Sequence, residues 1–146
     1  MSESQTRFYR DLREKGGLVY TVSSSFNVGK TRGVYEVQYG CDPPNVSKAH
    51  STVARDLKDM QTAPPTDHEV EEAKALLLRE IPLAESSVDT IAGGMLARSS
   101  MGLPLDEPIQ AARHYVALKP EDIRAAFAKW VRPDDLVQVT EGPAPQ

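Results

Sequence analysis

The hydrophobic periodicity of the chain changes at Asp42, and this change constrains the fold more than any other feature of the sequence. Residues 18–28 and 34–41 alternate with the period of two that is typical of strands, whereas apolar residues after Asp42 recur at helical spacing. The chain has 146 residues, 40% of them hydrophobic, which is enough for one domain with a real core. The sequence therefore predicts an α+β fold, in which an antiparallel sheet is covered by a layer of helices.

The two alternating runs flank a polar loop at residues 29–33, which has a glycine at each end. This arrangement predicts an antiparallel hairpin with one face toward the core. The residues expected on that face are Leu18, Tyr20, Val22 and Phe26, followed by Tyr35, Val37, Tyr39 and Cys41. Residues 136–140 predict a third, short strand. Because three strands are few for so many helices, we expect a further strand before residue 1 or from another chain.

Boundary signals predict the helices. Residues 8–15 are expected to be the end of a helix that Gly16 and Gly17 stop. Later helices are expected after Asn45, from a capping box at residues 66–69, over residues 87–100, after Asp106 and from Pro120. Pro82 is expected to bend or end the second of these. The side chains expected to face inward are Val46, Ala49, Val53, Leu57, Met60, Val70, Ala73, Leu77, Ile81, Val88, Ile91, Met95, Leu96, Ile123, Phe127 and Trp130.

Charge and composition exclude several classes of function. Lys and Arg number 17 against 21 Asp and Glu, for a net charge of −4, and no basic run suggests a nucleic-acid partner. One cysteine excludes a disulfide within the chain and a multi-cysteine zinc site. No apolar stretch is long enough for a membrane span, and residues 1–5 have no signal-peptide core. The residues leave the compartment open.

Four possible active-site signals are better explained by structural roles. Residues 28–31, Val-Gly-Lys-Thr, resemble a phosphate-binding loop, but Ser24 stands where its first glycine belongs and a strand follows instead of a helix. The histidines, at positions 50, 68 and 114, are far apart and fit no zinc motif. Cys41 is expected to be a small buried hydrophobic side chain, and residues 23–25 lack the glycine-flanked turn of a hydrolase nucleophile.

Arg13 and Tyr20 remain as candidate site residues, one on each side of the turn at Gly16 and Gly17. An arginine offers a fixed cation with several donors, and a tyrosine hydroxyl offers a neutral donor. Both suit a peptide carbonyl or a developing oxyanion. The residues alone leave a structural alternative open, in which Arg13 caps helix carbonyls and Tyr20 is an ordinary sheet aromatic.

The segment FYRDLREKGGLVY, residues 8–20, resembles the LRE-x-x-GL-x-Y segment of M16 (pitrilysin/insulinase) zinc peptidases. Weaker similarities follow in the same order at REIPL (79–83), SSVD (86–89), GLP (102–104) and WVRPDDL (130–136), and the resemblance covers nearly the whole chain. It identifies the chain as similar to the second, non-zinc-binding domain of that family. Residues 1–146 would then be one M16 inactive domain of the LuxS/MPP-like fold, shortened at its N-terminus and lacking its first strand and helix.

The resemblance implies a function shared with a second domain. A partner domain with an HxxEH motif would bind zinc and activate water, and this chain, which has no HxxEH and needs no cofactor of its own, would bind peptide. Tyr20 would donate to the scissile carbonyl oxygen, and Arg13 would position the substrate backbone or Tyr20. A missing first strand would expose a sheet edge and favour self-association. The resemblance also favours the bacterial periplasm over the cytoplasm.

Two other functions stay open. Some family members are structural or assembly subunits without peptidase activity, and a partner lacking HxxEH would favour that role. A chance similarity would leave an unrelated α+β binding module.

Overall fold

The structure is a computed structural model, and it describes residues 7–143. The expectation of a shortened N-terminus concerns residues 1–5, which lie outside the described residues. The chain divides into two compact units, which are described one at a time. The first comprises Met1–Asn27, Gly33–Ala63 and Arg124–Gln146, and the second comprises Val28–Arg32 and Pro64–Ile123.

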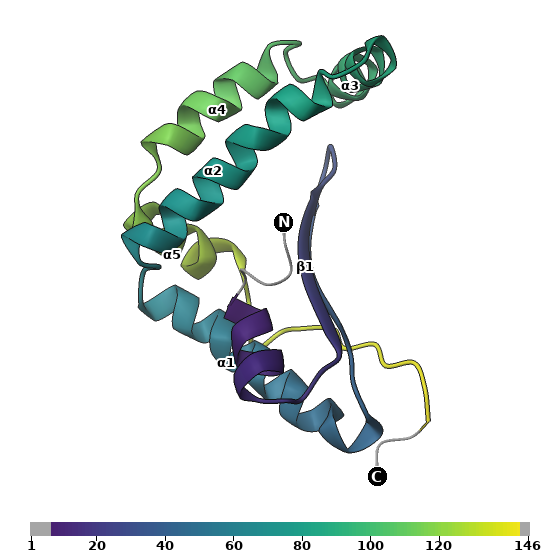
Figure 1. Ribbon diagram of the computed structural model, residues 1–146, viewed down its shortest axis with the longest axis vertical. Coiled ribbons are helices and arrows are strands. Elements are labelled where there is room, and N and C mark those ends of the chain that lie inside the picture. Colours follow the sequence, from purple (N-terminus) through teal and green to yellow (C-terminus); the bar gives the residue numbers. More distant parts are fainter. Residues whose placement is uncertain (1–6, 144–146) are drawn as a thin grey trace. The chain divides into compact units, whose positions relative to one another are not determined.

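The first unit begins with a short helix and a hairpin. A π-helix, η2 (Tyr9–Lys15), leads into strands β1 (Thr21–Val28) and β2 (Gly33–Gly40), which pair with each other in the part of the chain described (Figure 1). The turn between the strands is closed by the Gly29 N–H, which donates to the Arg32 carbonyl over 2.8 Å. This confirms the predicted hairpin and explains the glycine-bounded loop without a phosphate site.

One long helix provides the other side of this unit. After a 3₁₀ turn, η3 (Pro43–Asn45), helix α1 (Val46–Thr62) runs for 17 residues. The later part of α5 (Pro120–Trp130) closes the unit, because the Gln61 side-chain amide donates to the carbonyls of Phe127 over 3.2 Å and Val131 over 2.7 Å. These hydrogen bonds join helix α1 to a distant part of the chain, since Phe127 follows Gln61 by 66 positions.

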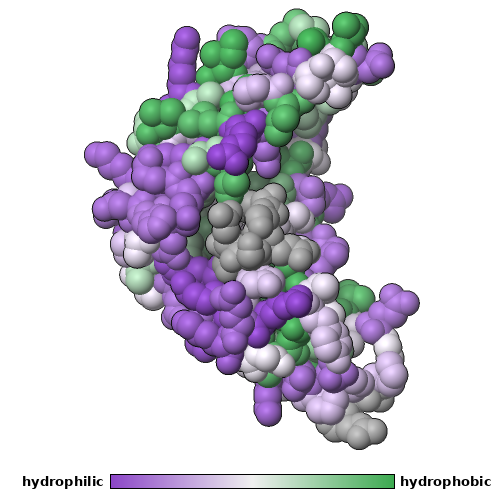
Figure 2. Space-filling model, in the orientation of Figure 1, coloured by the Kyte–Doolittle hydropathy of each residue, from purple (hydrophilic) through white to green (hydrophobic). Residues whose placement is uncertain are grey.

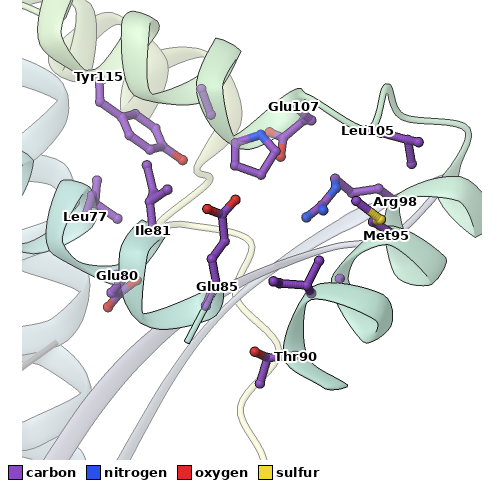
Figure 3. Close-up of a pocket in the computed structure, with 15 residues that line it drawn as sticks. Leu77, Glu80, Ile81, Glu85, Thr90, Met95, Arg98, Leu105, Glu107 and Tyr115 are labelled. Atoms are coloured by element: carbon purple, nitrogen blue, oxygen red, sulfur yellow. The ribbon is translucent and has the colours of Figure 1, made fainter. Parts of the chain in front are cut away.

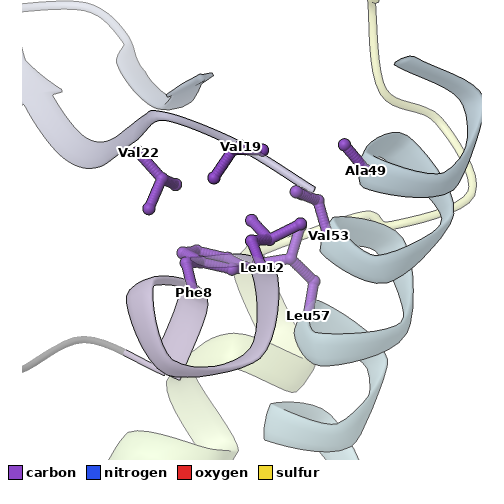
Figure 4. Packing of buried hydrophobic residues seen from close by; sticks show 7 residues of the cluster. All are labelled: Phe8, Leu12, Val19, Val22, Ala49, Val53 and Leu57. Carbon is purple, nitrogen blue, oxygen red and sulfur yellow. The ribbon is translucent and has the colours of Figure 1, made fainter. Parts of the chain in front are cut away.

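The hydrophobic core of the first unit lies between η2, the start of the hairpin and α1 (Figure 4). Its buried members are Phe8, Leu12, Val19, Val22, Ala49, Val53 and Leu57. The β2 side chains expected to face inward pack against this cluster, and the ring of Tyr35 meets that of Phe127 edge-on at 6.2 Å. The periodicity therefore predicted the covered face of β2 and the core face of α1 correctly.

The second unit is helical. Helix α2 (Asp67–Ala84) packs against both α3 (Val88–Met101) and α4 (Glu107–Ala117). The predicted capping box is confirmed, because the Glu69 N–H donates to the Thr66 hydroxyl and the Thr66 N–H donates to the Glu69 carboxylate. Pro82 lies inside α2, which ends two residues later. In the part of the chain described, no helix is long and apolar enough to cross a membrane.

Some predictions for the first unit are wrong. Residues 136–140 form no strand, because the described sheet pairs only β1 with β2. Val137 and Val139 in this segment are 93% and 88% exposed. Tyr20 and Phe26 are also exposed. The Phe26 ring lies instead over Gly33 of the neighbouring strand, where an added Cβ would be 3.1 Å from Cζ.

Several helical side chains expected to face inward are also exposed. Trp130 ends α5, where the Lys129 ammonium lies 4.7 Å from its ring centroid. On α3, Val88, Met95 and Leu96 are exposed, and Figure 2 shows apolar surface around this helix and α4. Helix α3 packs against α2, and this packing leaves those three side chains exposed. The helical spacing of apolar residues therefore predicted α3 correctly, but it predicted which of its side chains are buried only in part.

Candidate functional site

The turn between η2 and β1 is fixed by two backbone hydrogen bonds. The Gly17 N–H donates to the Arg13 carbonyl over 3.1 Å, and the Leu18 N–H donates to the Leu12 carbonyl over 2.8 Å. Each bond spans one residue more than its counterpart in a Schellman closure, which agrees with the π-helix that they end, and Gly17 has a left-handed φ of 57°. A Cβ at Gly16 would lie 2.7 Å from the Asp11 carbonyl oxygen. Both glycines therefore serve the tight turn that separates Arg13 from Tyr20.

Arg13 contacts Tyr20 through the backbone of Tyr20. The Arg13 guanidinium donates through Nη1 to the Tyr20 carbonyl oxygen and lies 5.5 Å from the ring centroid of Tyr9. The Tyr20 N–H donates to the Gly40 carbonyl over 2.8 Å. The backbone of Tyr20 is thus held from both sides, by an arginine and by the end of β2. The structure brings the two predicted site residues together and directs Arg13 to Tyr20 and not to a helix carbonyl.

The hydroxyl of Tyr20 has a neighbour that the sequence analysis missed. Interaction with the nearby Asp42 carboxylate, chiefly as a hydrogen-bond acceptor, raises the pKa of Tyr20 above its usual value of 10. The phenol therefore stays protonated at neutral pH. Its side chain is 57% exposed, so solvent or a ligand reaches it. The hairpin register carried the signal for Asp42, because a hairpin beginning near residue 20 and ending near residue 40 brings these positions side by side.

An ionic cluster joins η2 to α1 behind this turn. The Asp11 carboxylate lies 3.0 Å from Arg10 Nε, 3.4 Å from Lys15 Nζ and 3.8 Å from Arg55 Nη2. The hydrogen bond from Arg10 is the largest cause that lowers the pKa of Asp11. Because Arg55 belongs to α1, the cluster fixes the helix that carries Arg13 against the rest of the first unit.

Asp56 is a buried carboxylate beside this cluster. Its side chain is 5% exposed, and Oδ1 accepts from Arg55 Nη2 over 2.7 Å and from Nε over 3.0 Å. The other oxygen, Oδ2, is buried without a hydrogen-bond partner among the residues described. Burial is the largest cause that raises the pKa of Asp56. A half-satisfied buried carboxylate costs stability when charged, because its desolvation is not fully compensated.

The other candidates from the sequence stay apart. In residues 7–143, no three His, Cys, Asp or Glu side chains gather as metal ligands. His68 lies 3.8 Å from Glu72 on the surface of α2, and His50 lies on a different helix, α1. Cys41 is half-buried, and burial raises the pKa of its thiol, which disfavours a reactive thiolate. What this site offers chemically is a protonated, accessible hydroxyl whose backbone an arginine holds in place.

A family model and one solved structure point to the same family. The model of the family described as "Peptidase M16 inactive domain" matches residues 1–77. Among solved structures, the peptidase M16 inactive domain from Pseudomonas fluorescens is similar over 88% of this chain and 31% of its own, with 27% identity and a TM-score of 0.69. A conserved protein from Enterococcus faecalis V583 is similar in fold over 85% of this chain and 29% of its own, with 22% identity and a TM-score of 0.72. The chain thus spans about a third of the length of each. No curated protein matches the chain.

Proposed function

Since the chain belongs to the family of the peptidase M16 inactive domain, we propose that it is the non-catalytic half of an M16 zinc metalloendopeptidase. In this role it binds a peptide and completes a zinc site carried by a partner domain with HxxEH. The observation that carries the proposal is the Arg13–Tyr20 arrangement, in which an exposed phenol is held on a fixed backbone. The chain contains no HxxEH motif, so its own residues supply no family zinc site, and zinc belongs to the partner.

Tyr20 is proposed to donate a hydrogen bond to the carbonyl oxygen of the scissile peptide bond. As water attacks that carbonyl, its oxygen gains negative charge, and a donor aimed at it stabilises the transition state more than the ground state. The raised pKa of Tyr20 suits this role, because the hydroxyl keeps its proton at neutral pH. The Asp42 carboxylate, whose interaction raises the pKa of Tyr20, would compete with the substrate carbonyl for this hydroxyl.

Arg13 is proposed to be a positioning residue. Its guanidinium holds the Tyr20 carbonyl, and in this way it fixes the backbone from which the Tyr20 side chain extends. A lysine offers one point charge in place of the planar fork and does not reproduce this geometry. We therefore assign Arg13 a role in the placement of Tyr20 and Tyr20 the contact with the reacting carbonyl.

The partner and the assembly state are part of the same proposal. Within residues 7–143, β1 and β2 pair only with each other, and Phe26, Val28 and Val34 of this hairpin are exposed. An unpaired strand edge is a template for another strand, from a peptide, a partner domain or a second copy. We propose that the isolated chain self-associates through it. Light scattering over a range of protein concentrations tests this, and a constant monomer mass at the highest concentration would contradict it.

The test of function has two steps. Affinity capture from the source cell asks whether an HxxEH-bearing protein accompanies the chain. With that protein, Tyr20→Phe is expected to lower kcat by about 100-fold or more with little change in KM, as for the loss of one oxyanion donor. The matched control is Tyr35→Phe, because Tyr35 lies in the same hairpin but faces the core.

The outcomes separate the candidate functions. Equal activity of Tyr20→Phe and wild type would remove the catalytic role of Tyr20. Capture of a stable partner without HxxEH would instead support a structural or assembly subunit of the same family.

A further inference from the structure

A pocket of about 280 Å³ lies in the second unit, between α2, α3 and α4 (Figure 3). Its volume is close to the lower end of the range for small-molecule sites. Apolar side chains from all of its sides line it, namely Leu77, Ile81, Ile91, Met95 and Leu105. The pocket takes no part in the function proposed above, whose site residues Arg13 and Tyr20 belong to the first unit.

Arg98 supplies the cation of this pocket. Its Nε is buried and has no hydrogen-bond partner among the residues described, and no described carboxylate lies within ion-pair distance of its guanidinium. The side chain folds back over Gly94, one turn earlier on α3, where an added Cβ would be 3.2 Å from Nη1. The missing Cβ therefore leaves room for a guanidinium beside the helix. A buried donor without an acceptor costs free energy, which an acceptor oxygen from a ligand would recover.

Carboxylates and a hydroxyl complete the lining. Glu80, Glu85 and Glu107 line the same pocket, so it holds three acidic side chains and one basic one. Figure 3 shows the Glu85 carboxylate pointing into the space between Ile81 and Arg98, with the Tyr115 hydroxyl directed toward the same space. A multiply charged anion such as phosphate would meet these carboxylates at close range, and the acidic excess disfavours it. A ligand with both an acceptor oxygen and a cation fits the charges.

We propose that this pocket binds a small zwitterion with an apolar side chain, the chemistry of an apolar amino acid or dipeptide. The carboxylate of the ligand accepts from Arg98, its ammonium lies against Glu85, and its apolar side chain covers Ile81 and Ile91. Each group of the ligand meets a group that the pocket leaves unsatisfied or exposed to water. The two possible sources, a free amino acid and a dipeptide, share this chemistry and differ in the separation of their charges.

The test is an NMR titration of the whole chain with leucine and with Leu-Leu. We expect shifts confined to α2, α3 and α4, with a dissociation constant on the order of 1 mM for the better probe. N-acetyl-Leu-Leu and Leu-Leu amide each remove one charge, and each is expected to bind about tenfold more weakly. Stronger binding of leucine would identify the amino acid as the ligand, and stronger binding of Leu-Leu the dipeptide.

Substitutions link the binding to Arg98 and Glu85. Arg98→Met and Glu85→Gln are each expected to weaken binding of the better probe about tenfold. Gly94→Ala pushes the guanidinium from its place and is expected to do the same, whereas Gly93→Ala, whose added Cβ meets nothing within 4 Å, is the matched control and leaves binding unchanged.

Four results would overturn the proposal. The first is the absence of shifts at about 10 mM of either probe, and the second is equal binding of the charged and the blocked dipeptides. The third is equal binding by the Gly93 and Gly94 variants. The fourth is a double-mutant cycle in which Arg98 and Glu85 stabilise each other without ligand. The last would mean that Glu85 is the acceptor that Arg98 uses.

Discussion

Leu12→Ala tests whether the core of the first unit holds the helix that carries Arg13. Leu12 is fully buried, and it sits in η2 directly before Arg13. Its backbone carbonyl accepts from the Leu18 N–H, and this bond survives the substitution because alanine keeps the carbonyl. The variant therefore removes packing and leaves the hydrogen bonds of the turn in place.

The expected cost follows from the burial. Replacing leucine by alanine removes three carbon groups, each worth about 0.8 kcal/mol of transfer free energy when buried, or about 2.4 kcal/mol. The cavity left behind adds to this, so we expect the free energy of unfolding to fall by about 3 kcal/mol. The matched control is Leu96→Ala, because Leu96 is 73% exposed on α3, and we expect a change within about 0.5 kcal/mol.

Urea denaturation followed by circular dichroism measures both variants. A loss of about 3 kcal/mol corresponds to a melting temperature lower by roughly 10 °C for a chain of this size. If the two units unfold separately, only the transition of the first unit should shift in Leu12→Ala. A loss below about 1 kcal/mol, or equal losses for the two leucine variants, would refute the reasoning that Leu12 anchors η2 through packing.

Three further predictions concern the site and its supports. Burial raises the pKa of Asp56 above 3.8, so the native state binds this proton more tightly than the unfolded state does. The free energy of unfolding therefore falls as the pH rises from 3.8 through the raised pKa. Melting curves recorded against pH should show no such fall for Asp56→Asn, and an unchanged pH profile would contradict the prediction. Asp11 is expected to have the opposite effect, because its lowered pKa contributes stability that is present above pH 3.8 and is lost as the pH falls through the lowered value. In the same assay, Asp11→Asn should remove this loss of stability at acidic pH. Gly17→Ala should lower the free energy of unfolding by about 1 kcal/mol in urea denaturation, because φ at Gly17 is 57°. Gly93→Ala on α3 should raise it by about 0.5 to 1 kcal/mol. Equal effects of the two substitutions would contradict a left-handed conformation at Gly17.

The elements could be predicted from the sequence because their signals are local. The capping box at Thr66 and the glycines after Lys15 act within one turn of chain, and the structure has a helix boundary at each. Burial could not be predicted as well, because it depends on what covers a face. Val88 and Leu96 follow the helical period yet lie exposed, and Val139 alternates like a strand residue without a strand to pair with.

The candidate site follows the same division. Arg13 and Tyr20 stand at a spacing that the sequence displays, and the turn brings them together as expected. Asp42 escaped notice because its contact with Tyr20 depends on the register of a hairpin and not on sequence spacing. Arg98 escaped notice for a related reason, since only the packing of α2 against α3 and α4 turns a helix-surface arginine into the lining of a pocket.

The hydrogen bonds from Gln61 to Phe127 and Val131 make residues 64–123 an insertion between two segments that contact each other. Closing a loop of this length costs chain entropy that grows with the logarithm of its length. A linker of about eight residues in place of the insertion would lower that cost by about 2 kcal/mol while keeping both partners of Gln61. Because every buried member of the core around η2, the hairpin and α1 lies outside residues 64–123, we expect these helices to be exchangeable as a module without removing a buried residue of that core.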